Sequence, residues 1–227
     1  MRQINFELNP TLRCNLACPN CNRHCHLKPK WAEDSDITVE QLKRFVNLLR
    51  DCPAIKAKRV KVSGGEPFVH PDFPGLYQVL TGAVDEGLIL KIKIDSNGTL
   101  PRPKVSFHPA VHWSGRRPSR KRHLPTLWSP TDLGLPIQYP CGVPHVCGIS
   151  LDDRGFLPCS MAISIVRTFG WWEMYSDTFE TEWDMEKMCR HCVFAGPEEW
   201  RRVHCKPLSK FIPEELQPTK SWAEAMK

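Results

Sequence analysis

The chain has 227 residues, 41% of them hydrophobic and 25% charged, which suits one ordinary domain, or one domain with a small appendage, that buries a substantial core. Lysine and arginine number 31 against 25 acidic residues, so the net charge is +6. No apolar run is long enough to span a membrane and the first residues lack the apolar stretch of a secretory signal, so a membrane span is excluded and a cytoplasmic location is expected.

Hydrophobic periodicity predicts alternating strands and helices through the first half of the chain. Helices are expected at 38–50, where Thr38 and Gln41 suit a capping box, and at 74–86, where Gly87 provides a stop. Strands are expected at 3–8, 59–63, 88–95 and, as a short fourth, 104–107. This alternation predicts an α/β fold with a parallel sheet and right-handed crossovers.

Three unusual segments directly follow predicted strands. They are the cysteine-rich stretch 14–36, the pair Gly64-Gly65 and the triplet Ser96-Asn97-Gly98. Binding sites in parallel sheets gather at the carboxyl ends of the strands. We therefore expect the three segments to meet at one edge of the sheet.

Residues 101–140 differ from the rest of the chain in charge and proline content. They hold eight of the 21 prolines and one acidic residue, Asp132. Their seven basic residues supply an excess equal to the whole net charge: Arg102, Lys104, Arg116, Arg117, Arg120, Lys121 and Arg122. The stretch is predicted to be an extended connector that either holds a phosphate or a nucleic acid or is simply a solvated loop.

Cysteine spacing points to metal chemistry. Disulfides are rare in a reducing compartment, and eleven is an odd number of cysteines, so ligation is favoured over a disulfide framework. Cys14, Cys18 and Cys21 follow a C-x3-C-x2-C pattern within one loop. Three thiolates on a four-iron cube leave one iron open for chemistry. A closed zinc site is the alternative, with a fourth ligand from Cys25, His24 or His26.

The combination of two motifs resembles the radical S-adenosylmethionine (radical SAM) superfamily. The cysteine motif follows the first strand, and Gly64-Gly65-Glu66-Pro67 follows the second, as the superfamily's methionine-binding motif does. The resemblance covers residues 4–108. It departs from the common pattern at Asn20, where an aromatic residue is usual.

The resemblance implies a cluster ligand set and SAM contacts. Cys14, Cys18 and Cys21 would hold a [4Fe-4S] cluster whose open iron is chelated by SAM. The backbone of the two glycines would meet the SAM ammonium group. Glu66 would place a negative charge near SAM, and Pro67 would fix the turn. Ser96 and Asn97 would hydrogen-bond SAM, and Ser106 would offer it a hydroxyl group. His108 stands where an acid is commoner.

The implied reaction is reductive cleavage of SAM. An electron donor such as flavodoxin or ferredoxin would reduce the cluster, and the resulting 5′-deoxyadenosyl radical would take a hydrogen atom from the substrate. The expected substrate is a small polar or nucleotide-like molecule that undergoes oxidation, rearrangement or epimerisation. A ribosomally made peptide is the alternative substrate. A non-catalytic zinc module that binds nucleic acid is the alternative of a different class.

A second cysteine group lies late in the chain. Residues 149–159 suggest a hairpin around Asp153-Arg-Gly, and Cys189-x2-Cys192 follows. The group suits structural zinc or a second iron–sulfur cluster. It resembles the twitch form of the SPASM-like auxiliary domain, which implies an auxiliary [4Fe-4S] cluster on Cys141, Cys159, Cys189 and Cys192. Cys147 or Cys205 could replace one of these ligands.

The expected architecture is a partial, truncated (β/α) barrel followed by a small auxiliary-cluster domain of a β-hairpin and a helix. The expected segments are a core at 1–110, a connector at 111–140 that crosses the open side, and the auxiliary domain and tail at 141–227. The family's arginine near SAM would be Arg116, Arg117, Arg120 or Arg122. Five late tryptophans either wall a substrate site or pack a small core: Trp171, Trp172, Trp183, Trp200 and Trp222.

Overall fold

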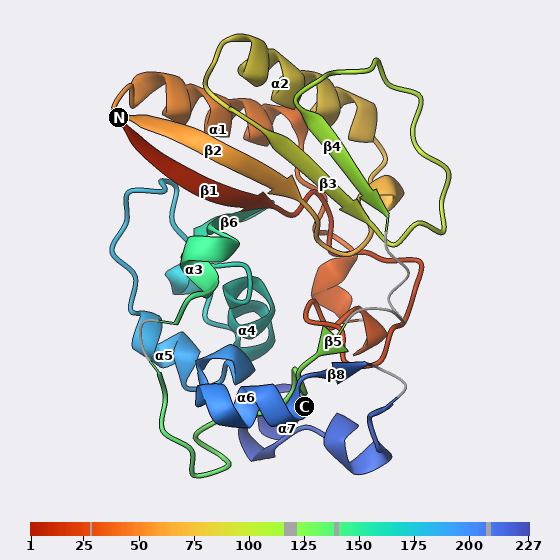
Figure 1. Ribbon diagram of the computed structural model, residues 1–227, viewed down its shortest axis with the longest axis vertical. Helices are drawn as coiled ribbons and strands as arrows, with labels where there is room; N and C mark the ends of the chain where they lie inside the picture. Colours follow the sequence, from red (N-terminus) through yellow and green to blue (C-terminus); the bar gives the residue numbers. More distant parts are fainter. Residues whose placement is uncertain (28, 116–121, 139–140, 208–209) are drawn as a thin grey trace.

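A mixed sheet carries the fold in the computed structural model, which describes residues 1–27, 29–115, 122–138, 141–207 and 210–227. Within these residues, six strands form one sheet in the order β4-β3-β2-β1-β6-β7 (Figure 1). All neighbours are parallel except the hairpin pair β6 and β7. The strands are β1 (Arg2–Leu8), β2 (Ile55–Val62), β3 (Ile92–Ser96), β4 (Val111–Gly115), β6 (Ile149–Asp152) and β7 (Gly155–Leu157). The predicted α/β class with parallel strands is confirmed.

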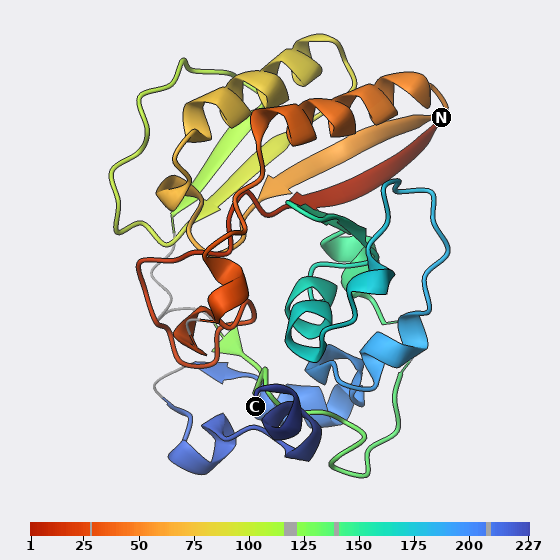
Figure 2. The ribbon, with the colours of Figure 1, turned by 180° about the vertical axis from the view of Figure 1, so that it is seen from behind.

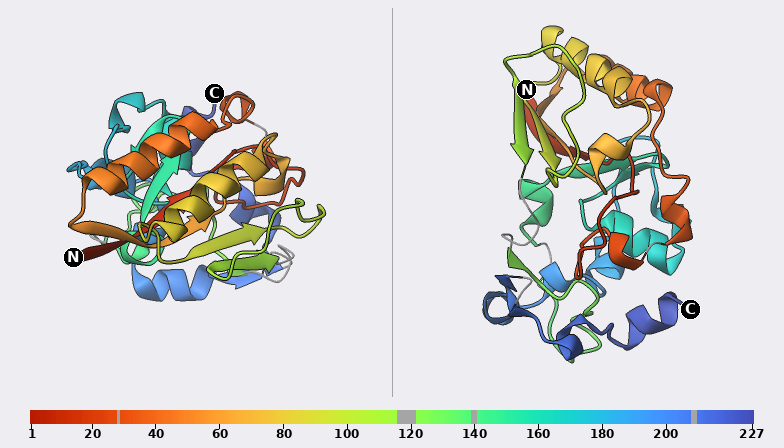
Figure 3. Two further views of the ribbon diagram at one scale, coloured as in Figure 1. Left: turned by 90° about the horizontal axis from the view of Figure 1, so that it is seen from above. Right: turned by 90° about the vertical axis from the view of Figure 1, so that its right-hand side faces the viewer.

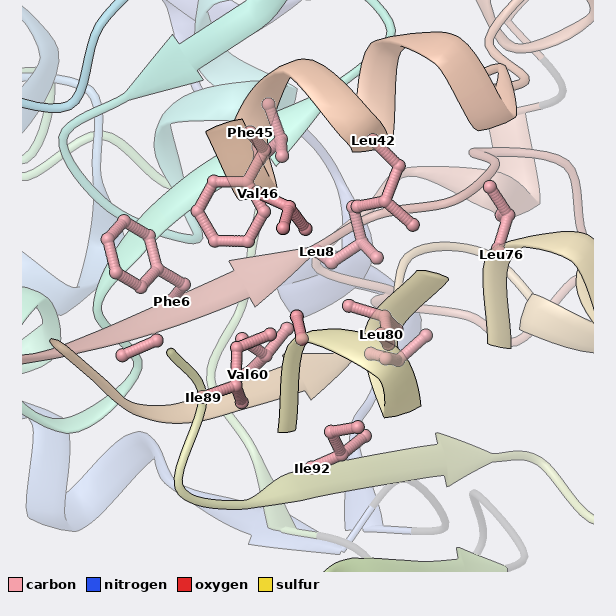
Figure 4. Close-up of a cluster of buried hydrophobic side chains, with 14 of the residues drawn as sticks. Phe6, Leu8, Leu42, Phe45, Val46, Val60, Leu76, Leu80, Ile89 and Ile92 are labelled. Carbon is pink, nitrogen blue, oxygen red and sulfur yellow. The ribbon is translucent and has the colours of Figure 1, made fainter. Parts of the chain in front are cut away.

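Two helices, α1 (Val39–Asp51) and α2 (Phe73–Asp85), cover one face of this sheet (Figure 3). The predicted capping box is present at the start of α1. The Thr38 hydroxyl accepts from Gln41 N at 3.1 Å, and the Gln41 side-chain oxygen accepts from Thr38 N at 2.7 Å. The main core lies between these helices and the sheet (Figure 4). Its central side chains include Phe6, Leu8, Leu42, Phe45, Val60, Leu80 and Ile92.

The C-terminal half packs on the opposite side of the sheet, together with the cysteine loop (Figure 2). Its helices are α3 (Val143–Val146), α4 (Ala162–Phe169), α5 (Met185–Cys189), α6 (Glu198–His204) and α7 (Lys220–Ala225). A second core, separate from the first, gathers around α4 and α5. A two-stranded ribbon, β5 (Arg122–His123) with β8 (Lys206–Pro207), joins the connector to this half.

The fourth strand is not where we predicted it. Residues 104–107 form no strand, and Phe107 is 87% exposed, whereas β4 starts at Val111 and pairs with Ile92 of β3. Trp113 of β4 stacks on Tyr77 of α2 with ring centroids 5.8 Å apart. The prediction at 104–107 is therefore wrong: Val105 packs against the core, but the pairing with β3 is made by residues 111–115.

The predicted hairpin around Asp153-Arg-Gly is confirmed, but its place differs from our expectation. We assigned it to a separate C-terminal domain, whereas β6 pairs with β1 in parallel, with Phe6 opposite Ile149. Gly148, at a φ of +92°, lies directly against the backbone of Asn5, where a Cβ would overlap the Asn5 carbonyl. The hairpin thus extends the central sheet on the β1 side, and β4 forms the other edge.

Candidate active site

The loops after β1, β2 and β3 meet at one edge of the sheet, as predicted, and enclose a cavity of about 320 Å³. All three predicted cluster cysteines line it, with both motif glycines, Ser96 and Asn97. The other lining residues are Leu16, Asn22, Arg23, Cys25, Lys61, Ser63, Asp95, Leu124, Thr126, Phe194 and Cys205. The cavity therefore lies between the cysteine loop, the strand ends, the connector and the C-terminal half.

The glycine pair packs against the cysteine loop. Gly65 N donates to Thr11 O, and Glu66 N donates to Arg13 O, both at 2.9 Å. An ideal Cβ at Gly65 would overlap the Arg13 carbonyl, and one at Gly64, whose φ is +105°, would overlap that of Thr11. These positions thus require glycine for the cysteine loop to approach, in addition to the role at SAM that the resemblance implies.

Glu66 joins the second and third loops. Its carboxylate is fully buried and accepts from Asn97 N at 2.7 Å and from Phe68 N at 3.2 Å, where it caps the short helix η3 (Pro67–Val69). Pro67 is the first residue of that helix, as expected for a residue that fixes a turn. The Asn97 side chain continues the chain of contacts, because its Nδ2 donates to Asn15 at 2.9 Å and lies 3.8 Å from the Cys14 sulfur.

The cysteine loop favours thiolates. Hydrogen bonds from the buried Cys25 thiol lower the pKa of Cys14 to about 7 and the pKa of Cys21 to about 6. The thiolate is the form that binds metals. The same contacts and burial raise the pKa of Cys25. Cys25 therefore stays protonated and donates to its neighbours in this structure.

Asn20 holds the cysteine loop to the connector. It has a φ of +64° and is buried. Its Oδ1 accepts from Thr126 N at 2.6 Å, and its Nδ2 donates to Leu124 O at 2.5 Å. Asparagine tolerates this left-handed backbone better than most residues. The departure from the aromatic residue thus corresponds to a specific contact with residues 124–126.

A charged network that the sequence did not reveal borders the cavity. Buried Glu7 accepts from Arg23, from Lys61 at 2.9 Å and from Ser63 at 3.0 Å. Burial alone would raise the pKa of Glu7, but its ion pairs with Arg23 and Lys61 outweigh that effect and hold the pKa below its ordinary value. The available signal was the charged residues within β2 and β3 and Glu7 near the end of β1, since parallel strands buried on both faces are usually apolar throughout.

Some predicted residues are not brought to the cavity. Ser106 does not line it, and its carbonyl accepts from the Tyr77 hydroxyl at 2.8 Å. His108 pairs with Asp85 at 3.1 Å on the far side of α2. Ser114 of β4, which we did not predict, instead lines a neighbouring cavity with Ser96 and Asn97. Its alternating segment, 111–115, was the available signal.

The connector can be followed only in part. The arginine candidates Arg116, Arg117 and Arg120, with Lys121, lie outside the described residues. Arg122 lies in β5. Residues 124–126 contact the cysteine loop through Asn20, so this part of the connector does lie across the cavity.

The second cysteine group also comes together. Cys141, Cys159, Cys189 and Cys192 are all buried and near enough to influence one another's charge. Burial raises the pKa of Cys159 to about 12 and that of Cys189 to about 11. The two possible substitutes lie elsewhere: Cys205 lines the first cavity, and Cys147 is half-buried after α3.

Neither group is drawn together tightly. Among the described residues, no three or more His, Cys, Asp or Glu side chains are arranged to hold a single metal ion. A zinc site draws its thiolates around one ion, whereas a [4Fe-4S] cube carries them on separate irons and needs a wider set.

Of the late tryptophans, Trp222 is buried in the second core, whereas Trp172 is exposed. No tryptophan is among the described residues that line the first cavity. Trp222 is 1% exposed and packs on Phe169 at 5.0 Å and on His24 at 4.8 Å between ring centroids.

Among the described residues, no helix is long and apolar enough to cross a membrane.

Comparison with known proteins identifies the region around the first cavity. The family model of the Radical SAM superfamily matches residues 8–106, which hold the cysteine loop, the glycine pair and the Ser96-Asn97 turn. Residues 8–106 are thus similar to the Radical SAM superfamily.

Curated relatives each match less than half of the chain. A probable GTP 3′,8-cyclase of Methanocella arvoryzae is 30% identical over 99 residues, 44% of this chain and 28% of that protein. A 7-carboxy-7-deazaguanine synthase of Aquifex aeolicus is 31% identical over 87 residues, 38% of this chain and 33% of that protein. The chain thus covers about a third or less of the length of these relatives.

Two solved structures are similar to the chain at low identity. BtrN in complex with AdoMet and 2-DOIA has a TM-score of 0.47 and 14% identity, over 72% of this chain and 75% of that one. SuiB of Streptococcus suis bound to S-adenosylmethionine has a TM-score of 0.35 and 19% identity, over 49% of this chain and 24% of that one.

Proposed function

We propose that the chain is a radical SAM enzyme with two iron–sulfur sites. The observation that carries this proposal is the single cavity in which Cys14, Cys18 and Cys21 face the glycine pair and the Ser96-Asn97 turn. In it, Cys14, Cys18 and Cys21 would hold a [4Fe-4S] cluster. When bound, this cluster and SAM would supply a 5′-deoxyadenosyl radical that takes a hydrogen atom from the substrate.

The chain's own residues would position the cofactor and exclude water. Gly64 and Gly65 would present backbone groups to the SAM ammonium, and Glu66 would fix their loop relative to Asn97. Leu124, Thr126 and Phe194 close the cavity from the connector and the C-terminal half. Because β4 is the last parallel strand on its side of the sheet, we propose a truncated barrel completed by these later segments.

We further propose that residues 141–227 carry a twitch-like auxiliary site, with hairpin strands β6 and β7 shared with the central sheet. Cys141, Cys159, Cys189 and Cys192 would hold a second [4Fe-4S] cluster. Their mutual proximity and burial support this assignment. Phe194 follows Cys192 closely and reaches the first cavity, so the auxiliary site would lie near a bound substrate.

The substrate class we propose is a small polar or nucleotide-like molecule, with flavodoxin or ferredoxin as the electron donor. Relatives named for GTP and for a deazaguanine favour a nucleotide-like substrate over a ribosomally made peptide. The described cavity has a volume of about 320 Å³ and its walls come from several segments, which suits a small molecule.

Anaerobic preparation tests the proposal. Two filled clusters give about eight irons per chain, and dithionite with SAM should yield 5′-deoxyadenosine. Replacing Cys14, Cys18 and Cys21 by alanine should leave about four irons and abolish 5′-deoxyadenosine. Replacing Cys189 and Cys192 should also remove about four irons but retain cleavage of SAM. A colourless protein that binds zinc would overturn the proposal in favour of a zinc module.

A further inference from the structure

One guanidinium nitrogen of Arg23, at the first cavity, has no hydrogen-bond partner among the described residues. Its side chain is only 4% exposed. Its Nη2 donates to Glu7, and its Nε donates to Asn9 Oδ1 at 3.0 Å. Its Nη1 is buried and has no hydrogen-bond partner among the described residues, and Arg23 lines the cavity. A buried charged donor without an acceptor is costly, which indicates that an acceptor belongs beside it.

Lys61 adds a second cation at the same place. It donates to the other Glu7 oxygen at 2.9 Å, so one carboxylate holds both cations side by side, and Lys61 also lines the cavity. Asp95 lies 3.7 Å from Lys61 but is also paired with Lys93 at 3.1 Å. Among these five side chains, three cations face two carboxylates in a partly buried network, which Arg23 extends to the neighbouring thiol of Cys21.

We propose that Arg23 and Lys61 form a subsite for a compact oxyanion of the substrate, a carboxylate or a phosphate. This deepens the proposed function and depends on it for the identity of the substrate. A charge-assisted hydrogen bond to Arg23 Nη1 would satisfy the orphaned nitrogen. Asn97 contacts Cys14 at the other end of the cysteine triad, so the subsite beside Cys21 is distinct from the contacts proposed for SAM.

Titration of simple anions tests the subsite without a known substrate. Inorganic phosphate and acetate are titrated by calorimetry into the cluster-loaded protein saturated with SAM, at constant ionic strength. We expect saturable one-to-one binding of at least one anion, and the stronger one identifies the class of oxyanion. Arg23→Gln and Lys61→Gln should each raise Kd at least about tenfold. Arg50→Gln is the matched control, because Arg50 pairs with Glu86 on the exposed surface.

Three outcomes would overturn the subsite. They are no binding of either anion to the wild-type protein, unchanged Kd in both variants, and weakened SAM affinity in Arg23→Gln with unchanged anion binding, which would assign the arginine to SAM. If Arg23→Gln fails to fold or load iron, Lys61→Gln decides the question, because the Lys61 side chain is less buried than that of Arg23. Formation of 5′-deoxyadenosine without substrate tests the proposed function separately, so failure of one is distinguishable from failure of the other.

Discussion

At the scale of single residues, Gly65 is the position where the backbone of one motif touches the other. A methyl group there would overlap the Arg13 carbonyl. We expect Gly65→Ala to displace the cysteine loop and to reduce iron in the first site from about four per chain to less than about one. The measurement is iron content after anaerobic reconstitution.

Gly82→Ala is the control for this prediction, because Gly82 lies within α2 and nothing stands within 4 Å of its added Cβ. That variant should load iron normally and should be as stable as the wild type or about 1 kcal/mol more stable. Normal iron loading in Gly65→Ala would contradict the close packing of the two loops.

Asn20 gives a second prediction at this scale. Asn20→Gly keeps the left-handed backbone but loses the hydrogen bonds to residues 124 and 126, and should cost about 1–3 kcal/mol in the free energy of urea unfolding. Asn20→Ala should cost more, because alanine is also strained at that φ. Asn47→Ala on the exposed face of α1 should change the free energy by less than about 0.5 kcal/mol. Equal stabilities of all three variants would show that the Asn20 contacts are unimportant.

The sequence allowed prediction of the residues whose chemistry is local. Cysteine spacing and a glycine pair mark a site by themselves, and both are at the cavity. It did not allow prediction of Glu7, Arg23 and Lys61, which come from three segments and become a network only when β1, β2 and the cysteine loop are assembled.

At the scale of elements, the pairing of the β6–β7 hairpin with β1 depends on the close approach of two backbone segments. Gly148, at a φ of +92°, lies against Asn5 of β1, and a Cβ there would overlap the Asn5 carbonyl. We expect Gly148→Ala to weaken the pairing of β1 with β6 and to increase hydrogen exchange at the amides of residues 149–152 at least about tenfold. Gly142→Ala, where nothing stands within 4 Å, should leave that exchange unchanged.

The turn of the same hairpin should make stability depend on pH. Burial, together with the neighbouring Asp152, raises the pKa of Asp153 to about 6, above its ordinary value near 3.8. The folded protein therefore holds this proton to higher pH than the unfolded chain, so the contribution of Asp153 to stability declines as pH rises. Between pH 5 and pH 7, the free energy of unfolding of the wild type should fall by about 1 kcal/mol relative to Asp153→Asn.

Urea unfolding of both proteins at several pH values measures this difference. The comparison with Asp153→Asn cancels other titrating groups, because they are common to both chains. A difference that stays constant from pH 5 to pH 7, or that grows in favour of the wild type, would contradict the raised pKa.

Helix ends were predictable because their signals are local, as the capping box at Thr38 shows. The position of the fourth strand was not predictable from local signals. Residues 104–107 and 111–115 have similar propensity to form a strand, and the choice between them depends on contact with Ile92 and Tyr77. The pairing of β6 with β1 was hidden for the same reason: Phe6 and Ile149 are far apart in the sequence, and no turn residue records their contact.

At the scale of the whole molecule, two cores lie on opposite sides of the sheet and the cavity lies beside the second. The cysteine loop contributes to both arrangements, because Leu12 belongs to the second core and Arg23 pairs with Glu7 of β1. Loss of the first cluster should therefore lower the stability of the protein well beyond the loop. We expect chelation of iron to lower the melting temperature by several degrees, with a smaller effect in a variant that already lacks Cys14, Cys18 and Cys21.

The order in which the cavity walls are made has a consequence for biosynthesis. The cysteines and the glycine pair occupy the first third of the chain, whereas Phe194 and Cys205 belong to the last fifth. As the ribosome extends the polypeptide, the iron-binding pocket exists with one side open until those late residues emerge. Iron and sulfide that reach the three cysteines before the C-terminal half docks would therefore enter through that open side.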